Sequence, residues 1–137
     1  MLKAVLDTNV VVSAHLNLEG PPRIILDLAF SRFFRCFASD PLLKEYEEVL
    51  KRPCFARDPK EIAKSMRLMR NAITIVIPRR KLRITSDPDD NIVLECALEA
   101  RVDYVVTGNS QDFPERFQDI RIISPRRFLT ILASTPN

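Results

Sequence analysis

The chain has 137 residues, of which 46% are hydrophobic and 28% are charged, and its formal net charge is +3. This balance is typical of a single globular domain over residues 1–137 and excludes a disordered chain. No apolar run approaches the roughly 18–20 residues of a membrane span, so we expect a cytoplasmic protein without membrane contact. The chain has only two glycines, Gly20 and Gly108, which excludes the Rossmann and P-loop motifs.

Cysteine and histidine usage limits the kinds of metal site. Cys36, Cys54 and Cys96 are odd in number and widely spaced, which argues against disulfides and zinc clusters. We therefore expect each to be buried as a small apolar residue. The single histidine, His15, excludes a multi-histidine site, and we expect it to have a packing or surface role on an amphipathic helix.

Strands and helices are expected to alternate along the chain. Three Asp-Pro pairs mark helix starts, with Asp40, Asp58 and Asp87 as N-caps. We expect the β-branched run at 73–77 to be buried on both faces. The alternation predicts an α/β/α fold with three layers and a central, mostly parallel sheet of about five strands. In chain order the elements are strand 3–6, helices 9–17 and 21–32, strand 35–39, helices 41–52 and 59–72, strand 73–77, helix 88–101, strands 103–108 and 121–124, and a helix from Pro125.

Polar residues follow two of these strands. Asp7-Thr8-Asn9 closes the first strand, and Thr107-Gly108-Asn109 closes the strand near 103–107. Sheets of this type bind ligands at the carboxyl ends of their strands, so these groups form the candidate site. The segment SDPDDN at 86–91 opens a helix and adds three carboxylates. Capping explains Asp87, and capping with surface charge is the simpler interpretation of the triplet taken alone.

The helix at 41–52 offers a further carboxylate. Its apolar stripe consists of Leu42, Leu43, Tyr46, Val49 and Leu50. Glu48 points away from that stripe, while Glu45 and Glu47 lie on its opposite flanks. Helix geometry alone leaves both flanking glutamates as candidates for the site.

A cluster of Asp and Glu without His or Cys suits a hard cation such as Mg²⁺. Crowded carboxylates repel one another, and a bound divalent ion relieves that repulsion. Such an ion activates water and stabilises charge on a phosphoryl oxygen, so the pattern indicates phosphodiester chemistry.

Four segments in this order resemble the PIN-domain family of metal-dependent ribonucleases, and in particular its VapC-like toxin branch. They are LDTNVVVSA at 6–14, LLKEYEEVLKRP at 42–53, DPDDNIVLECALEARVDYVVTGN at 87–109 and DFP at 112–114. The resemblance implies a PIN-like fold, a Mg²⁺ or Mn²⁺ cofactor and endonucleolytic cleavage of RNA. It also implies a small antitoxin partner and a homodimer.

The resemblance also assigns residue roles. Asp7, Glu45 and Asp90 match the catalytic metal ligands, which favours Glu45 over Glu47. Asn109 stands where relatives often have a fourth acid. It can still ligate through its amide oxygen, with Asp87 and Asp112 as weaker candidates. The polar positions that orient the carboxylates are matched by Thr8, Asn9, Ser13 and Thr107.

The basic run Arg79-Arg80-Lys81 is a candidate contact for the RNA backbone, although ordinary solvated surface also explains it. The main alternative function is a catalytically weak PIN-like module that binds RNA or a protein, and Asn109 favours it. A phosphoaspartyl phosphotransferase using Asp7 is a second alternative, but LDTNV lacks the second Asp of D-x-D-x-T.

Overall fold

A six-stranded sheet forms the centre of the computed structural model, which describes residues 1–135. The strands lie in the order β3-β2-β1-β4-β6-β5, and the neighbouring pairs are parallel except for the β5–β6 hairpin. The expected mostly parallel sheet is therefore confirmed, with six strands instead of about five. Their bounds are Lys3–Leu6 (β1), Arg35–Ala38 (β2), Thr74–Ile75 (β3), Tyr104–Val106 (β4), Arg116–Phe117 (β5) and Ile120–Ile123 (β6).

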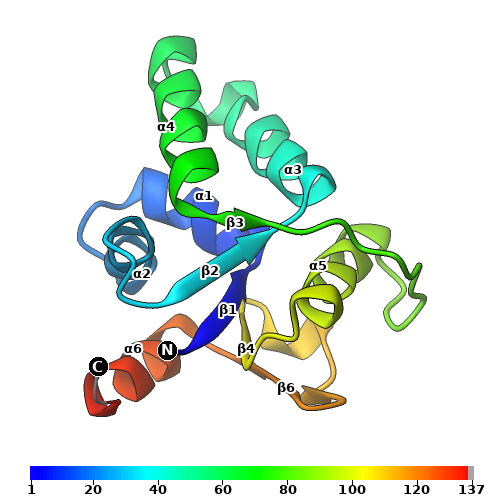
Figure 1. Cartoon of the computed structure of the whole chain (residues 1–137). Coiled ribbons are helices and arrows are strands. Elements are labelled where there is room, and N and C mark those ends of the chain that lie inside the picture. The colour runs from blue at the N-terminus through cyan, green and yellow to red at the C-terminus, as the bar shows by residue number, and fades with distance from the viewer. Residues whose placement is uncertain (136–137) are drawn as a thin grey trace.

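Helices cover both faces of the sheet. Figure 1 shows α5 on one side and α1 and α2 on the other, which confirms the three-layer arrangement. None of the helices within residues 1–135 is both long and apolar enough to cross a membrane. Their bounds are Thr8–Leu16 (α1), Pro21–Phe30 (α2), Asp40–Leu50 (α3), Pro59–Ala72 (α4), Pro88–Ala100 (α5) and Pro125–Ser134 (α6), with short 3₁₀ helices at Pro53–Phe55 and Ser110–Asp112.

The core lies where the central strands meet these helices. Val5 of β1 and Val105 of β4 are fully buried between the two helical layers. Helix α3 buries its apolar stripe through Leu42, Leu43, Tyr46 and Leu50. Each such side chain contributes about 1.5–3 kcal/mol when it is fully buried. The packing of α3 against α1, α4 and α5 therefore fixes where Glu45, on the flank of that stripe, can reach.

Some expectations about individual elements were wrong. Strand β3 has only two residues and both are exposed, because it lies at the edge of the sheet and pairs only with β2. Helix α3 is capped by Ser39, whose hydroxyl accepts from the Leu42 N–H at 3.3 Å, while Asp40 is already helical. Cys36 and Cys96 are buried as expected, but Cys54 is exposed in the turn after α3.

His15 has the packing role expected of it. Its side chain is buried at the end of α1, where the ring nitrogens contact the Val11 carbonyl and the Ser65 hydroxyl of α4. These two contacts account for both ring nitrogens and tie α1 to α4.

Candidate active site

Parallel pairing places the ends of β1 and β4 side by side. Leu6 is in register with Val106, and the Asp7 N–H donates to the Val106 carbonyl at 2.9 Å. Asp7 and Thr107 therefore lie next to each other at the carboxyl edge of the sheet. From α3, the Tyr46 hydroxyl donates to the Leu6 carbonyl and joins that helix to the same edge.

Asp7 is buried and its carboxylate is held by three neighbours. One oxygen accepts from the Thr8 N–H at 2.8 Å, so Asp7 also serves as the N-cap of α1. The other accepts from the Thr107 hydroxyl at 2.8 Å and from the Asn9 amide at 3.1 Å. Burial raises the pKa of Asp7 above its ordinary value of 3.8, while these hydrogen bonds lower it. The carboxylate is thus fixed in orientation before any ligand binds.

A second set of hydrogen bonds fixes the loop after β4. The Thr107 hydroxyl accepts from the Asn109 N–H at 3.0 Å, and the Asn9 amide oxygen accepts from the Gly108 N–H at 2.9 Å. The first turn of α1 and residues 107–109 consequently behave as one unit around Asp7.

Glu45 reaches this unit from α3. Its carboxylate accepts from the Thr8 hydroxyl at 2.7 Å, and the side chain is half-buried. Burial raises the pKa of Glu45 from 4.5 to about 7, and the charges of Asp89 and Asp7 add to the rise. Glu47, by contrast, forms an ion pair with Lys51 at 2.9 Å. Of the two flanking glutamates, the structure brings Glu45 to Asp7.

Asp90 approaches from the first turn of α5. Burial raises its pKa from 3.8 to about 6, and the charges of Asp7, Asp87 and Asp112 contribute next. Asp87 is the N-cap of α5, as expected, with its carboxylate accepting from the Asp89 N–H at 2.9 Å. Asp112 also raises the pKa of Asp7. Acids from four parts of the chain therefore share one electrostatic environment.

Two of the expected site residues contribute less. Asn109 is exposed, and its contact with the site runs through its backbone N–H to Thr107. Ser13 is exposed on α1, and its hydroxyl forms no hydrogen bond with any residue between 1 and 135. The structure therefore places Thr8, Asn9 and Thr107 around the acids and leaves Ser13 outside.

Sequence reasoning missed the contribution of Asn91. This side chain is buried at the fourth position of α5, where its oxygen accepts from the N–H groups of Ile84 (3.2 Å) and Thr85 (2.9 Å). Its amide donates to the Thr85 carbonyl at 3.1 Å. Asn91 thus holds the segment before α5 and sets the position of Asp90. The signal available in the sequence was the amide of Asn91 directly after Asp89 and Asp90, at a helix position where a buried apolar residue would be expected.

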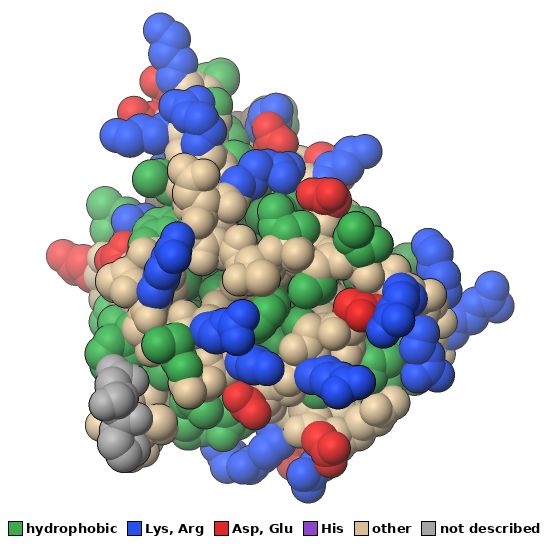
Figure 2. Space-filling view, in the orientation of Figure 1, with side chains coloured by type: hydrophobic (Ala, Val, Ile, Leu, Met, Phe, Trp, Pro, Cys, Tyr) green, Lys and Arg blue, Asp and Glu red, His purple; other side chains and the backbone are tan. Residues whose placement is uncertain are grey.

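The basic run does not lie with the acids. Arg79 forms an ion pair with Glu99 at 3.3 Å, near the carboxyl end of α5, whereas Asp90 is in the first turn of that helix. Nine helical residues correspond to about 14 Å along the axis. Figure 2 shows Lys and Arg side chains spread over much of the drawn face, with Asp and Glu between them.

The donor types fit a hard cation, although the side chains do not converge on a point. Among residues 1–135, no three Asp, Glu, His or Cys side chains are arranged as a ready-made metal site. The charge of Asp7 nevertheless raises the pKa values of Glu45 and Asp90. The charge of Asp112 raises the pKa values of Asp7 and Asp90. A divalent ion would relieve this repulsion with the oxygen donors that Mg²⁺ and Mn²⁺ prefer.

A small pocket of about 260 Å³ lies beside Glu45, between α3 and the start of α5. Lys44 and Arg52 lie on its rim together with Asp89, and Val49 and Ile92 give it an apolar wall. A substrate could therefore lie against α3 within reach of the acids.

Comparison with known proteins places this chain in a family. The PIN domain model matches residues 3–111. The chain is 30% identical over 111 residues to the uncharacterized protein MJ1680 of Methanocaldococcus jannaschii, covering 79% of this chain and 71% of that protein. Two solved structures share the fold, each with a TM-score of 0.60.

The first is a chain of VapBC2 from Rickettsia felis bound to a DNA fragment from their promoter, at 17% identity, covering 90% of this chain and 98% of that chain. The second is a chain of VapBC-1 from nontypeable Haemophilus influenzae, at 16% identity, covering 91% and 99%. The family match begins in β1 and ends beyond Asn109, so it includes every carboxylate that surrounds Asp7 except Asp112. This chain belongs to the PIN-domain family.

Proposed function

We propose that this protein is a Mg²⁺- or Mn²⁺-dependent endoribonuclease, the toxin of a toxin–antitoxin pair, acting in the cytoplasm. One observation carries the proposal: Asp7, Glu45 and Asp90 come from three separate elements into one acidic environment at the carboxyl edge of the sheet. Membership of the PIN-domain family supports nuclease chemistry. The fold shared with the VapBC chains supports the toxin assignment.

Asp7, Glu45 and Asp90 would hold the cation, with Asn109 beside them and Asp87 and Asp112 as weaker ligands. When bound, the ion would lower the pKa of a water molecule and stabilise charge on the phosphoryl oxygens. Asn109 supplies a neutral oxygen where relatives often have an acid, so the site has one negative charge fewer. A single tightly held ion suits this charge better than two.

The neighbouring polar residues orient the carboxylates. Thr107 and Asn9 donate to the same oxygen of Asp7, which limits rotation of the carboxylate and favours its charged form. The Thr8 hydroxyl holds Glu45 in the same way. Carboxylates held in this way lose little rotational freedom when they bind a ligand, and this lowers the cost of forming the site.

RNA would reach the acids past the pocket between α3 and α5. Lys44 and Arg52 on its rim are suited to phosphate contacts, and Val49 and Ile92 to the flat face of a sugar or base. Arg80 and Lys81 stay candidates for a more distant backbone contact. A small antitoxin and a second copy of the chain are the proposed protein partners.

The test is cleavage of a structured RNA with Mn²⁺, with and without EDTA, by wild type, Asp90→Asn and Asp58→Asn. Asp90→Asn keeps size and removes one charge from the acidic environment, so activity should fall by orders of magnitude. Asp58 caps α4 away from the acids, and asparagine also caps, so Asp58→Asn is the matched control and should cleave normally. Cleavage that persists in EDTA, or in Asp90→Asn, would exclude this mechanism.

A catalytically weak binding module is the second candidate, because exposed Asn109 replaces a frequent acid of the family. Wild type that binds Mn²⁺ but cleaves no RNA would favour this candidate. Asn109→Asp should then tighten Mn²⁺ binding and introduce measurable cleavage.

A further inference from the structure

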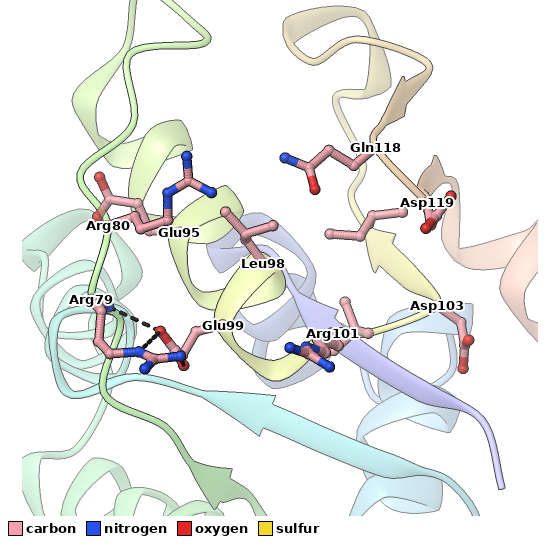
Figure 3. Close-up of a pocket in the computed structure, with 11 residues that line it drawn as sticks. Arg79, Arg80, Glu95, Leu98, Glu99, Arg101, Asp103, Gln118 and Asp119 are labelled. Carbon is pink, nitrogen blue, oxygen red and sulfur yellow. Dashed lines mark hydrogen bonds and ion pairs between the residues drawn. The ribbon is translucent and has the colours of Figure 1, made fainter.

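A second pocket, of about 710 Å³, lies at the opposite end of α5 from the acids. It is formed by the segment around Arg80, the last turns of α5 and the turn between β5 and β6 (Figure 3). We call it the distal pocket and define it by Arg80, Leu98, Arg101, Gln118, Asp119 and Ile120. Its volume is in the range typical of sites for small ligands, about 300–1,000 Å³.

Two of these residues have an unfavourable backbone conformation. Arg101, the C-cap of α5, has φ 53°, and Gln118, in the turn between β5 and β6, also has φ 53°. Glycine adopts such a conformation freely, whereas a residue with a side chain is strained in it. Both positions thus have a polar side chain where glycine would give a more stable fold, and both side chains line the same pocket.

The distal pocket also contains polar groups without partners. Arg79 is paired with Glu99, Glu95 accepts from the Leu82 N–H at 2.8 Å, and Asp103 accepts from the Lys3 N–H at 2.9 Å. Within residues 1–135, the side chains of Arg80, Arg101, Gln118 and Asp119 form no hydrogen bond or ion pair. Two guanidinium groups, an amide and one carboxylate are therefore available to a ligand.

Charge and shape limit what this ligand can be. Counting all charges, the lining has four acids and three arginines, which disfavours a long polyanion. The unpartnered groups instead suit a compact molecule with one strong anion and a polar edge. In Figure 3, Arg80 and Gln118 approach the pocket from opposite sides, and both can donate to an anion between them. Leu98 offers a partly exposed apolar surface for a flat ring, and Ile120, which is buried, lies at the back of the pocket.

We propose that the distal pocket binds a nucleoside monophosphate, with guanine as the favoured base. Arg80 and Gln118 hold the phosphate, because they face each other across the pocket (Figure 3) and Lys81 follows Arg80 in the chain, whereas Glu99 and Asp103 lie beside Arg101. The base lies over Leu98. Arg101 donates to its carbonyl edge, and Asp119 accepts from its amino and imino groups. Guanine is the base that presents both of these patterns side by side.

The experiment measures the thermal shift of the full chain with GMP, AMP, guanosine or inorganic phosphate. GMP should raise the melting temperature of wild type, and guanosine should bind about tenfold or more weakly because it lacks the charged phosphate. A short RNA with a terminal guanosine phosphate separates an RNA end from a free nucleotide as the source. No shift with GMP would overturn the proposal, and an equal shift with AMP would overturn the guanine assignment.

Arg101→Gly gives the sharper readout. Glycine relieves the backbone strain, so the ligand-free variant should melt at a higher temperature than wild type while its response to GMP is abolished. Arg80→Ala should abolish the response without that gain. The matched control is Arg32→Gly, an arginine with φ 58° outside the pocket, which should keep the full GMP response. A GMP response that persists in both Arg101→Gly and Arg80→Ala would show that the ligand binds elsewhere. Asp7→Asn should respond normally, so this result is independent of nuclease activity.

Discussion

Asp7 serves two purposes with one side chain, because the carboxylate that begins α1 is also the centre of the acidic site. An asparagine at this position can still accept from the Thr8 N–H. Its amide would then face two other donors, the Thr107 hydroxyl and the Asn9 amide. Asparagine at position 7 would therefore keep the helix cap, but it would remove the negative charge and leave two donors without a matching acceptor.

Metal binding should depend on Asp7. If an ion binds only the folded state, a concentration of 100 Kd adds about 2.7 kcal/mol to the free energy of unfolding. Wild type should show this gain with millimolar Mn²⁺ in a thermal melt, and Asp7→Asn should remove most of it. Asp58→Asn provides the control for removal of a surface charge. An equal gain in wild type and Asp7→Asn would exclude Asp7 from the site.

The raised pKa values of the acids predict how the metal-free protein responds to pH. Glu45 titrates at about 7 in the folded chain against 4.5 ordinarily, and Asp90 at about 6 against 3.8. At pH values between the ordinary and the raised pKa of each residue, the folded state holds a proton that the unfolded state has released. Unfolding then releases protons, so the free energy of unfolding should fall as the pH rises toward 7.

This fall is best measured as a difference between two proteins in EDTA. His15 acts in the opposite direction, because burial lowers its pKa and the unfolded chain binds a proton first as the pH falls. Comparing wild type with Glu45→Gln cancels that contribution. The melting temperature of Glu45→Gln should decline less between pH 5 and 7.5 than that of wild type. Parallel curves would show that the pKa of Glu45 is not raised in the folded protein.

At the scale of elements, helix starts show how far local sequence rules extend. Asp58 and Asp87 cap their helices as predicted. At Asp40-Pro41, however, the N-cap is the preceding residue, Ser39. The Ser39 side chain is buried after the end of β2, where its hydroxyl accepts from the Leu42 N–H of α3. Asp40 points outward and pairs weakly with Arg70 at 3.4 Å.

Substitution of the two residues should separate these roles. Ser39→Ala removes the cap and should cost about 1 kcal/mol in the free energy of unfolding. Asp40→Ala removes an exposed charge near the helix start and should cost about half of that or less. Urea denaturation with an unchanged m-value measures both. A larger effect for Asp40→Ala would reverse the assignment.

A feature of the structure could be predicted from the sequence where nearby residues determine it. The strand at 3–6 and the cap at Asp87 follow from nearby residues, and both predictions agree with the structure. The strand predicted at 121–124 lies one residue earlier, at Ile120–Ile123. The run at 73–77 reads as a buried strand because its residues are β-branched, yet only its position at the sheet edge decides that β3 is short and exposed. The contact of Glu45 with Thr8, which lies 37 positions away, could not be predicted from periodicity. The contact of Asn91 with Thr85 spans only six positions, but it depends on the path of the loop before α5, which periodicity does not describe.

At the scale of the whole molecule, the two ends of α5 belong to different sites. Its first turn carries the acids, and its last turns carry the distal pocket with Arg79 bound to Glu99. The net charge of +3 is modest and the basic residues are dispersed. Attraction of RNA should therefore come from a few local contacts rather than from a strong overall field.

The salt dependence of RNA binding tests this distribution. Removing one side chain that binds a phosphate of single-stranded RNA should reduce the log–log slope by about 0.7. Arg80→Ala combined with Lys81→Ala should therefore reduce it by up to about 1.4, whereas Arg79→Ala should change it little, since Glu99 already neutralises that side chain. Fluorescence anisotropy across a salt series gives the slopes. An unchanged slope for the double variant would identify the run as solvated surface.

The pairing of β1 with β4 has a consequence for how the protein is made. Leu6 and Val106 are neighbours in the sheet but lie 100 positions apart in the chain, as do Asp7 and Thr107. During synthesis the first half emerges with Asp7 and Glu45 but without the partners that fix them, and long-range pairings of this kind form late. For the nuclease proposed above, a chain still growing on the ribosome would carry no assembled site, so the RNA of the machinery producing it would be exposed to cutting only after release.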